Sequence, residues 1–109
     1  MTSNTEQIRN LNDRLRKDFN EGVAVLTPGV AALGADVVAR IVKTISVYDD
    51  FCRANDPHGE GDFGAFESEG HVIFFKIDYY DNTLTFHSPD AADPSVTKRV
   101  ITIMLADEY

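Results

Sequence analysis

Apolar residues recur at helical spacing in two parts of the chain. Near the start, Ile8, Leu11, Leu15 and Phe19 lie three or four residues apart, and Ser3 and Glu6 before them have the spacing of a capping box. The second stripe, which begins after Ala35, consists of Val37, Val38, Ile41, Val42, Ile45 and Tyr48. The pattern predicts one helix that ends near Asn20 and another from Ala35 to about Asp50.

Between residues 63 and 87 the pattern changes to the alternation of β-strands. Glu69-Gly70 and Asp81-Asn82 are two-residue hairpin signals, so three strands are predicted to form a meander. Pairing Ser68 with His71 and Tyr80 with Thr83 sets the register. One face of the meander is then apolar: Phe66, Ile73, Phe75, Ile77, Tyr79, Leu84 and Phe86. The other is mixed: Phe63, Ala65, Glu67, Val72, Phe74, Lys76, Asp78, Tyr80, Thr83, Thr85 and His87.

The remaining segments complete the predicted fold. Val23 to Thr27 is expected to form a short strand, followed by a type II turn at Pro28-Gly29. Asp93 and Pro94 have the character of a helix start, and the apolar residues after them predict a C-terminal helix. The order α-β-α-β-β-β-α indicates one α+β domain over residues 1–109. In it, three helices pack mainly on one face of an antiparallel meander of three to four strands.

The charge of the chain is unevenly distributed. The formal net charge is -8, yet residues 49–93 hold eleven acidic side chains and only Arg53 and Lys76 as basic ones. Such a segment repels phosphate backbones, which argues against direct nucleic-acid binding and favours a basic protein surface as partner. The plainer interpretation is that the charge serves solubility. No apolar run is long enough for a membrane span, no leader is recognised, and Cys52 is the only cysteine, so a cytoplasmic location is expected.

The stretch Asn55 to Glu67, "NDPHGEGDFGAFE", gathers acidic side chains, a histidine and three glycines, which raises the question of a site. Asp56, His58, Glu60, Gly61 and Glu67 match some positions of an EF-hand calcium loop, but Pro57 and His58 fit that motif poorly and a strand is expected to follow. The letters "DFG" lack the other motifs of a kinase. Cys52 has the context of a buried small apolar residue. The stretch is therefore interpreted as a structured acidic loop, with no cofactor or metal assigned.

Several blocks of the sequence are similar to a known family. "YDDF", "NDPHGEGDFGAFE", "FFKIDYYD", "SPDAADPSVTKRV" and "TIMLADEY" resemble a bacterial family of short proteins of unknown function, domain-of-unknown-function family 3768. The resemblance implies a compact bacterial domain, often encoded on mobile elements beside anti-restriction genes. It names no catalytic or binding residue.

Three functional hypotheses follow. The first is a non-catalytic domain that binds a basic protein, for example an inhibitor of a host defence nuclease of the restriction or CRISPR type. Its candidate partner-binding residues are Asp56, Glu60, Asp62, Phe63, Phe74, Lys76, Asp78, Tyr80 and His87. The second is a small enzyme or a ligand- or metal-binding domain that uses Lys76, Asp78, Tyr80 and His87. The third is a homodimer built on the mixed sheet face.

Overall fold

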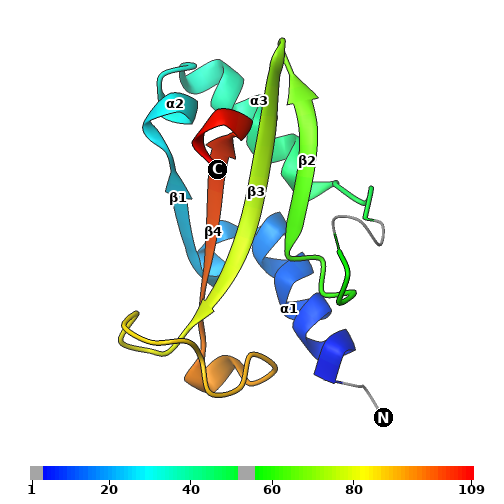
Figure 1. Ribbon diagram of the computed structural model, residues 1–109, viewed down its shortest axis with the longest axis vertical. Helices are drawn as coiled ribbons and strands as arrows, with labels where there is room; N and C mark the ends of the chain where they lie inside the picture. Colours follow the sequence, from blue (N-terminus) through cyan, green and yellow to red (C-terminus); the bar gives the residue numbers. More distant parts are fainter. Residues whose placement is uncertain (1–3, 52–55) are drawn as a thin grey trace.

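The computed structural model describes residues 4–51 and 56–109 (Figure 1). Its helices are α1 (Asn4–Lys17), α2 (Pro28–Ala31) and α3 (Ala35–Ser46). Its strands are β1 (Val23–Leu26), β2 (Phe63–Ser68), β3 (His71–Tyr80) and β4 (Lys98–Leu105). Three 3₁₀ turns complete the elements: η1 (Phe19–Glu21), η2 (Pro94–Val96) and η3 (Ala106–Glu108). None of the described helices is long and apolar enough to cross a membrane.

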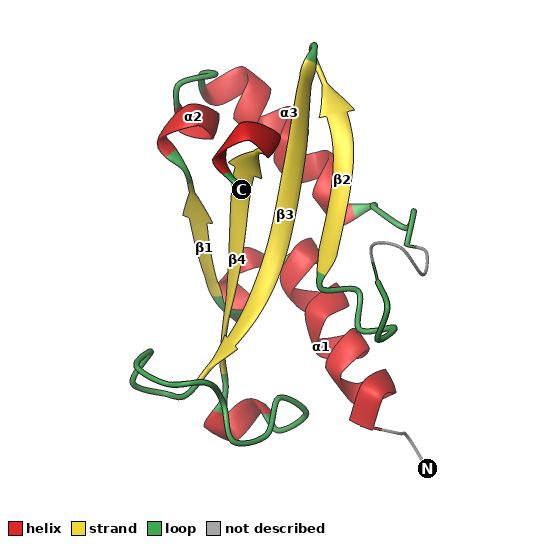
Figure 2. Ribbon diagram, in the orientation of Figure 1, coloured by secondary structure: helices red, strands yellow, loops and turns green. Residues whose placement is uncertain are grey.

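The four strands form one mixed sheet in the order β1-β4-β3-β2 (Figure 2). β3 is antiparallel to both of its neighbours, whereas β1 runs parallel to β4. The predicted β2-β3 hairpin is confirmed, with Ser68 opposite His71 and Phe66 opposite Ile73. Glu69 and Gly70 both have positive φ, at 51° and 84°. That pair of angles is typical of the two-residue turn that matches strand twist.

Helices α1 and α3 cover one face of this sheet (Figure 1). The alternation along β3 places Ile73, Phe75 and Ile77 on that face, all at most 3% exposed. They share the core with residues of β4 and of both helices: Ile101, Ile103, Leu15, Ile41 and Ile45. Burial of these aliphatic and aromatic side chains, each contributing roughly 1.5–3 kcal/mol, holds the two layers together. The predicted α+β class and the two long helices are confirmed, although α1 ends at Lys17 before a separate 3₁₀ turn.

The predicted third strand of the meander, residues 83–87, is wrong. Its only ladder contact is an isolated bridge between Tyr80 and His87. The Asp81 carboxylate accepts hydrogen bonds from the backbone N–H groups of Thr83 and Thr85, both at 3.1 Å. A side chain that satisfies local backbone donors in this way competes with strand pairing. Leu84 and Phe86, expected in the core, are 49% and 71% exposed.

The predicted C-terminal helix is also wrong, because residues 98–105 form β4. β4 lies beside β3, with Ile77 opposite Ile101. The predicted meander places residues 83–87 in that position. The run Val100 to Ile103 consists of β-branched residues, which favour strands, and apolar periodicity alone does not separate a short buried helix from a strand. Asp93 and Pro94 do begin a helical turn, but it ends at Val96.

The first strand is confirmed, but its pairing makes the sheet mixed, and the prediction of a purely antiparallel sheet is wrong. β1 pairs with β4, a neighbour that the predicted C-terminal helix would not offer. The predicted turn at Pro28-Gly29 is instead the first turn of α2, with Pro28 at a helix start where its missing N–H costs nothing.

Candidate functional site

One face of the sheet is covered neither by α1 nor by α3, and it faces the viewer in Figure 1, where the η3 turn lies over one end of it. Strand alternation and register place the following residues there: Val23 and Val25 of β1; Lys98, Val100, Thr102 and Met104 of β4; Val72, Phe74, Lys76, Asp78 and Tyr80 of β3; and Phe63, Ala65 and Glu67 of β2. We call this surface the open face. Six candidate residues were predicted to share it, and the observed register agrees for five: Phe63, Phe74, Lys76, Asp78 and Tyr80. The placement of His87 in a third strand of this face is wrong, because His87 makes only an isolated bridge to Tyr80 and its ring lies 6.5 Å from that of Tyr79, a residue of the helix-covered core.

Three aromatic rings meet at one end of the open face. The ring centroids of Phe63 and Phe74 are 5.3 Å apart, and Tyr109 lies 5.9 Å from the first and 5.7 Å from the second. All three pairs have the edge-on geometry that aromatic rings prefer. We call Phe63, Phe74 and Tyr109 the aromatic cluster. Tyr109 is 76% exposed, whereas Phe63 and Phe74 are half-buried, so the cluster presents part of its apolar surface to solvent.

Glu108 explains how the last residue reaches the sheet. Its carboxylate accepts hydrogen bonds from the Thr27 hydroxyl at 2.6 Å and from the backbone N–H groups of Gly29 and Leu105. These donors, the Thr27 hydroxyl first, lower the pKa of Glu108. The bonds tie the η3 turn to the start of α2. Tyr109 follows directly and is thereby directed onto Phe63 and Phe74.

A hollow adjoins the aromatic cluster. It is lined by Pro57, His58, Asp62, Phe63, Lys76, Ile77, Asp78 and Tyr109. Lys76 Nζ and Asp78 Oδ2 are 3.0 Å apart, with side chains 40% and 38% exposed. The hydrogen bond from Lys76 to Asp78 raises the pKa of the lysine. We call this depression the sheet-face hollow; it brings a cation, carboxylates and aromatic rings together.

Asp62 is a half-buried carboxylate of this hollow. Burial raises the pKa of Asp62, and the nearby carboxylates of Glu60 and Asp56 raise it further. Its backbone carbonyl accepts the N–H of Ile77 at 2.8 Å, which fixes the residue beside β3. The carboxyl group is therefore held where its charged form is disfavoured.

Replacing Asp62 with asparagine should raise the melting temperature at neutral pH, because the folded protein then no longer buries this charge. A carboxyl group whose pKa is raised on folding favours the native state at low pH, and that contribution is lost as the pH rises from 3.8 through the folded pKa. The gain should thus disappear below pH 3.8 in a series of thermal melts. Asp81→Asn is the matched control and should lower the melting temperature at neutral pH. Hydrogen bonds lower the pKa of Asp81, and the largest effect comes from the Thr83 side chain. A lower melting temperature for Asp62→Asn at neutral pH would contradict the prediction.

The acidic loop, residues 56–62, is anchored to α1 by its first residue. The carboxylate of Asp56 accepts the N–H of Gly61 at 3.0 Å and an Arg9 guanidinium N–H at 3.2 Å. Arg9 also donates to the carbonyl of Gly59. Gly59 and Gly61 have φ of 72° and 65°, angles that residues with a side chain rarely adopt. Asp56 is only 8% exposed, so its carboxylate stabilises the loop from the inside and does not face solvent.

A buried polar network lies beneath the same loop. Asn12, which is fully buried, donates through Nδ2 to the Tyr79 hydroxyl at 2.8 Å and to the Glu60 carbonyl at 3.1 Å. The Tyr79 hydroxyl donates to Glu60 Oε1 at 2.8 Å, and Arg99 Nε donates to Asn12 Oδ1 at 2.9 Å. Burial raises the pKa of Tyr79 and lowers that of Arg99. This network joins α1, the acidic loop, β3 and β4.

The nine candidate residues thus fall into three groups. Asp62, Phe63, Lys76 and Asp78 line the sheet-face hollow, and Phe74 adjoins it through the aromatic cluster. Asp56 and Glu60 direct oxygens to partners inside the chain. Tyr80 lies at the far end of β3, where it bridges His87, whose ring is 6.5 Å from that of Tyr79. Cys52 and Asn55 lie outside the described residues.

Sequence reasoning missed Tyr109 as a member of the site. The predicted C-terminal helix would carry the tyrosine away from the sheet. Recognising Val100 to Ile103 as a strand would have placed Tyr109 just beyond its end, beside the face of Phe74. The β-branched run was the available signal.

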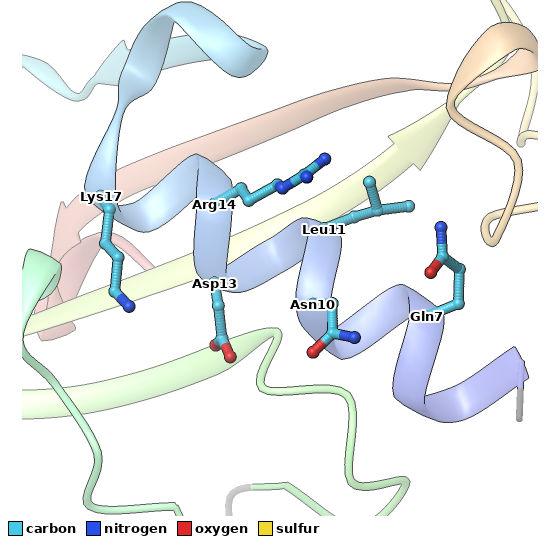
Figure 3. A pocket seen from close by; sticks show the side chains of 6 residues that line it. All are labelled: Gln7, Asn10, Leu11, Asp13, Arg14 and Lys17. Carbon is cyan, nitrogen blue, oxygen red and sulfur yellow. The ribbon is translucent and has the colours of Figure 1, made fainter. Parts of the chain in front are cut away.

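A second depression runs along α1 (Figure 3). It is lined by Gln7, Asn10, Leu11, Asp13, Arg14 and Lys17. In Figure 3, Gln7, Leu11 and Arg14 point to one side of the helix, whereas Asp13 and Lys17 point to the other. Its charged side chains therefore do not converge on one point, and we do not assign a role to it.

The residues that match a calcium-binding loop in sequence have other roles in the structure. Across residues 4–51 and 56–109, no group of three or more His, Cys, Asp or Glu side chains is placed to hold a metal ion. Asp56 and Glu60 bond to the protein, and Glu67 lies within β2.

Comparison with known proteins places most of the chain in one family. The model of the family described as "Protein of unknown function (DUF3768)" matches residues 26–108. No curated protein and no solved structure matches the chain. The matched range contains β2, β3, β4 and the acidic loop, so it includes the whole lining of the sheet-face hollow except Tyr109.

Proposed function

The chain belongs to the DUF3768 family of proteins of unknown function, and we propose that it is a non-catalytic domain that binds a basic protein in the cytoplasm through its open face. The observation that supports this most is the position of the exposed aromatic cluster directly beside the carboxylates of Asp62 and Asp78. Protein interfaces combine such aromatic anchors with a charged rim. The anchors contribute affinity, and the carboxylates select a partner of opposite charge.

The distribution of charge supports a basic partner on this side of the molecule. Helices α1 and α3 carry six basic and three acidic side chains, on the opposite face of the sheet. The acidic loop, by contrast, brings Asp62 to the open face, where it lines the sheet-face hollow together with Asp78. The open face and its hollow carry three carboxylate side chains against two lysines: Asp62, Glu67 and Asp78 against Lys76 and Lys98. A cation-rich surface is therefore attracted there more than to the helical layer, whose basic side chains are in excess.

Among basic surfaces, the nucleic-acid channel of a host defence nuclease of the restriction or CRISPR type is the partner to test first. Such a channel binds phosphates with Arg and Lys side chains. Carboxylates on a rigid sheet can form ion pairs with those side chains in place of the phosphates. In this narrower form of the proposal, the protein is an inhibitor encoded by a mobile element.

The proposal predicts that two surface substitutions remove binding. The wild-type protein is used to capture basic proteins from a host lysate treated with nuclease, and each captured protein is purified and titrated by calorimetry. Asp78→Lys and Tyr109→Ala should each weaken the complex at least about tenfold, since one removes the charge match and the other an aromatic anchor. Raising the salt concentration should weaken the wild-type complex as well.

Asp36→Lys is the matched control for Asp78→Lys. Asp36 is an exposed carboxylate in the first turn of α3, in the helical layer, and its substitution changes the net charge equally. Binding should be unchanged in this variant. The proposal fails if Asp78→Lys and Tyr109→Ala bind as tightly as wild type, or if Asp36→Lys is equally impaired.

A second candidate function is binding or conversion of a small molecule in the sheet-face hollow. It is favoured by the raised pKa of Asp62 beside the Lys76–Asp78 pair, because perturbed carboxyl groups in hollows are common at active sites. Tyr80 and His87 do not line this hollow. A metabolite or metal ion that raises the melting temperature of wild type, but not of Lys76→Ala, would support this candidate over a protein partner.

A further inference from the structure

The outer edge of β1 is apolar and exposed. All four residues of the strand are exposed, with Val23, Val25 and Leu26 at 37%, 42% and 39%. In Figure 1 no described element lies beyond β1 on the side away from β4. Charged side chains, prolines and bulges protect sheet edges from pairing, and the sequence "VAVL" contains none of them.

The backbone groups on this edge can be identified from the pairing with β4. The N–H of Thr27 donates to the carbonyl of Ile103, and Leu26 is opposite Ile103 in the parallel ladder. Successive residues of a strand direct their N–H and C=O groups to alternate sides. Val25 and Thr27 therefore bond toward β4, while Ala24 and Leu26 direct their N–H and C=O groups to the free edge.

We propose that two copies of the protein pair through this edge, β1 against β1, antiparallel about a twofold axis at Val25. In this register Ala24 of one copy is opposite Leu26 of the other, and the same pair recurs on the far side of the axis. Every outward N–H and C=O of Ala24 and Leu26 then finds a partner. Because this arrangement of outward donors and acceptors is complementary to itself about the twofold axis, a second copy of the strand can pair with all of these groups.

The charge distribution also selects a second copy at this edge rather than elsewhere on the molecule. β1 has no charged residue and lies at the opposite end of the sheet from β2. Joining two β1 strands keeps the acidic loops, which precede β2, far apart, so repulsion between two chains of net charge -8 is screened. At the other edge, the Tyr48 hydroxyl already accepts the N–H of Ala65 in β2.

The pairing would place both open faces on the same side of one continuous sheet. A twofold axis perpendicular to the sheet keeps the helices of both copies together on the other side. Because the contact is only four residues long in each copy, we expect it to bury less than the roughly 1,200 Å² of a stable complex. We therefore expect a dimer that forms reversibly as the protein concentration rises, whether or not a partner occupies the open face.

Hydrogen exchange on the wild-type protein tests the pairing without a substitution. The amides of Val25 and Thr27 should be protected at every concentration, because β4 accepts their bonds. The amides of Ala24 and Leu26 should exchange fast in dilute protein and become protected between about 10 µM and about 1 mM, the range of weak association. Fast exchange of both amides at the highest concentration would overturn the proposal.

Sedimentation of variants gives the second test. Wild type should shift from monomer to dimer over the same range of concentration, whereas Val25→Lys should stay monomeric because it sets two like charges against each other at the axis. Val72→Lys, at a valine 48% exposed near the opposite edge, is the matched control and should dimerise as wild type does. A wild-type protein that stays monomeric, or a Val25→Lys variant that dimerises normally, would refute the pairing. A dimer lost in Val72→Lys but kept in Val25→Lys would instead assign the contact to the open face.

Discussion

Replacing Asn12 with alanine is expected to lower the free energy of unfolding by roughly 3 kcal/mol. The amide is fully buried and bonds to the Tyr79 hydroxyl, the Glu60 carbonyl and Arg99 Nε. Its removal leaves the Glu60 carbonyl and Arg99 Nε without this partner, and the Tyr79 hydroxyl with only its bond to Glu60 Oε1. An unpaired buried group costs about 1–3 kcal/mol, and more where it is charged, as in Arg99. Urea denaturation followed by circular dichroism measures the change.

Asn10→Ala provides the control on the same helix. Asn10 is exposed, so its loss should alter the free energy of unfolding by less than about 0.5 kcal/mol. Equal stabilities of Asn12→Ala and Asn10→Ala would mean that the buried network contributes nothing net to the fold.

Replacing Asp56 with alanine should cost roughly 2–3 kcal/mol and open the acidic loop. The N–H of Gly61 loses its acceptor, and Gly61 is a buried residue. The ion pair with Arg9 adds little, because the Arg9 side chain is 39% exposed and water screens its charge. Urea denaturation gives the free energy, and hydrogen exchange should show faster exchange at the Gly61 amide.

Asp49→Ala removes the same charge from an exposed position, and it should leave both measurements near those of wild type. If Asp56→Ala matches Asp49→Ala in stability and in Gly61 exchange, the carboxylate does not hold the loop.

These expectations change which carboxylates can test partner binding. Reversing the charge of Asp56 or Glu60 would damage the loop itself, since both side chains bond within the protein. Asp78, with a side chain 38% exposed on the open face, is the appropriate position for charge reversal. A loss of binding in that variant can then be separated from a loss of fold.

Local sequence by itself determined the elements whose contacts are close along the chain. The apolar stripes specified α1 and α3, since helical spacing brings side chains to one face without help from the rest of the protein. Glu69-Gly70 specified the β2-β3 hairpin, because a two-residue turn also sets the register of the strands that it joins. That register was enough to place Phe63, Phe74, Lys76, Asp78 and Tyr80 on one face.

Tertiary structure decided the rest. Residues 98–105 carry an apolar pattern compatible with either a helix or a strand, and only the vacant edge of β3 makes the strand favourable. The parallel pairing of β1, the position of Tyr109 and the burial of Asn12 and Arg99 all depend on β4. Each of these contacts joins residues distant in sequence, and no local periodicity records which distant strand will satisfy an open backbone edge.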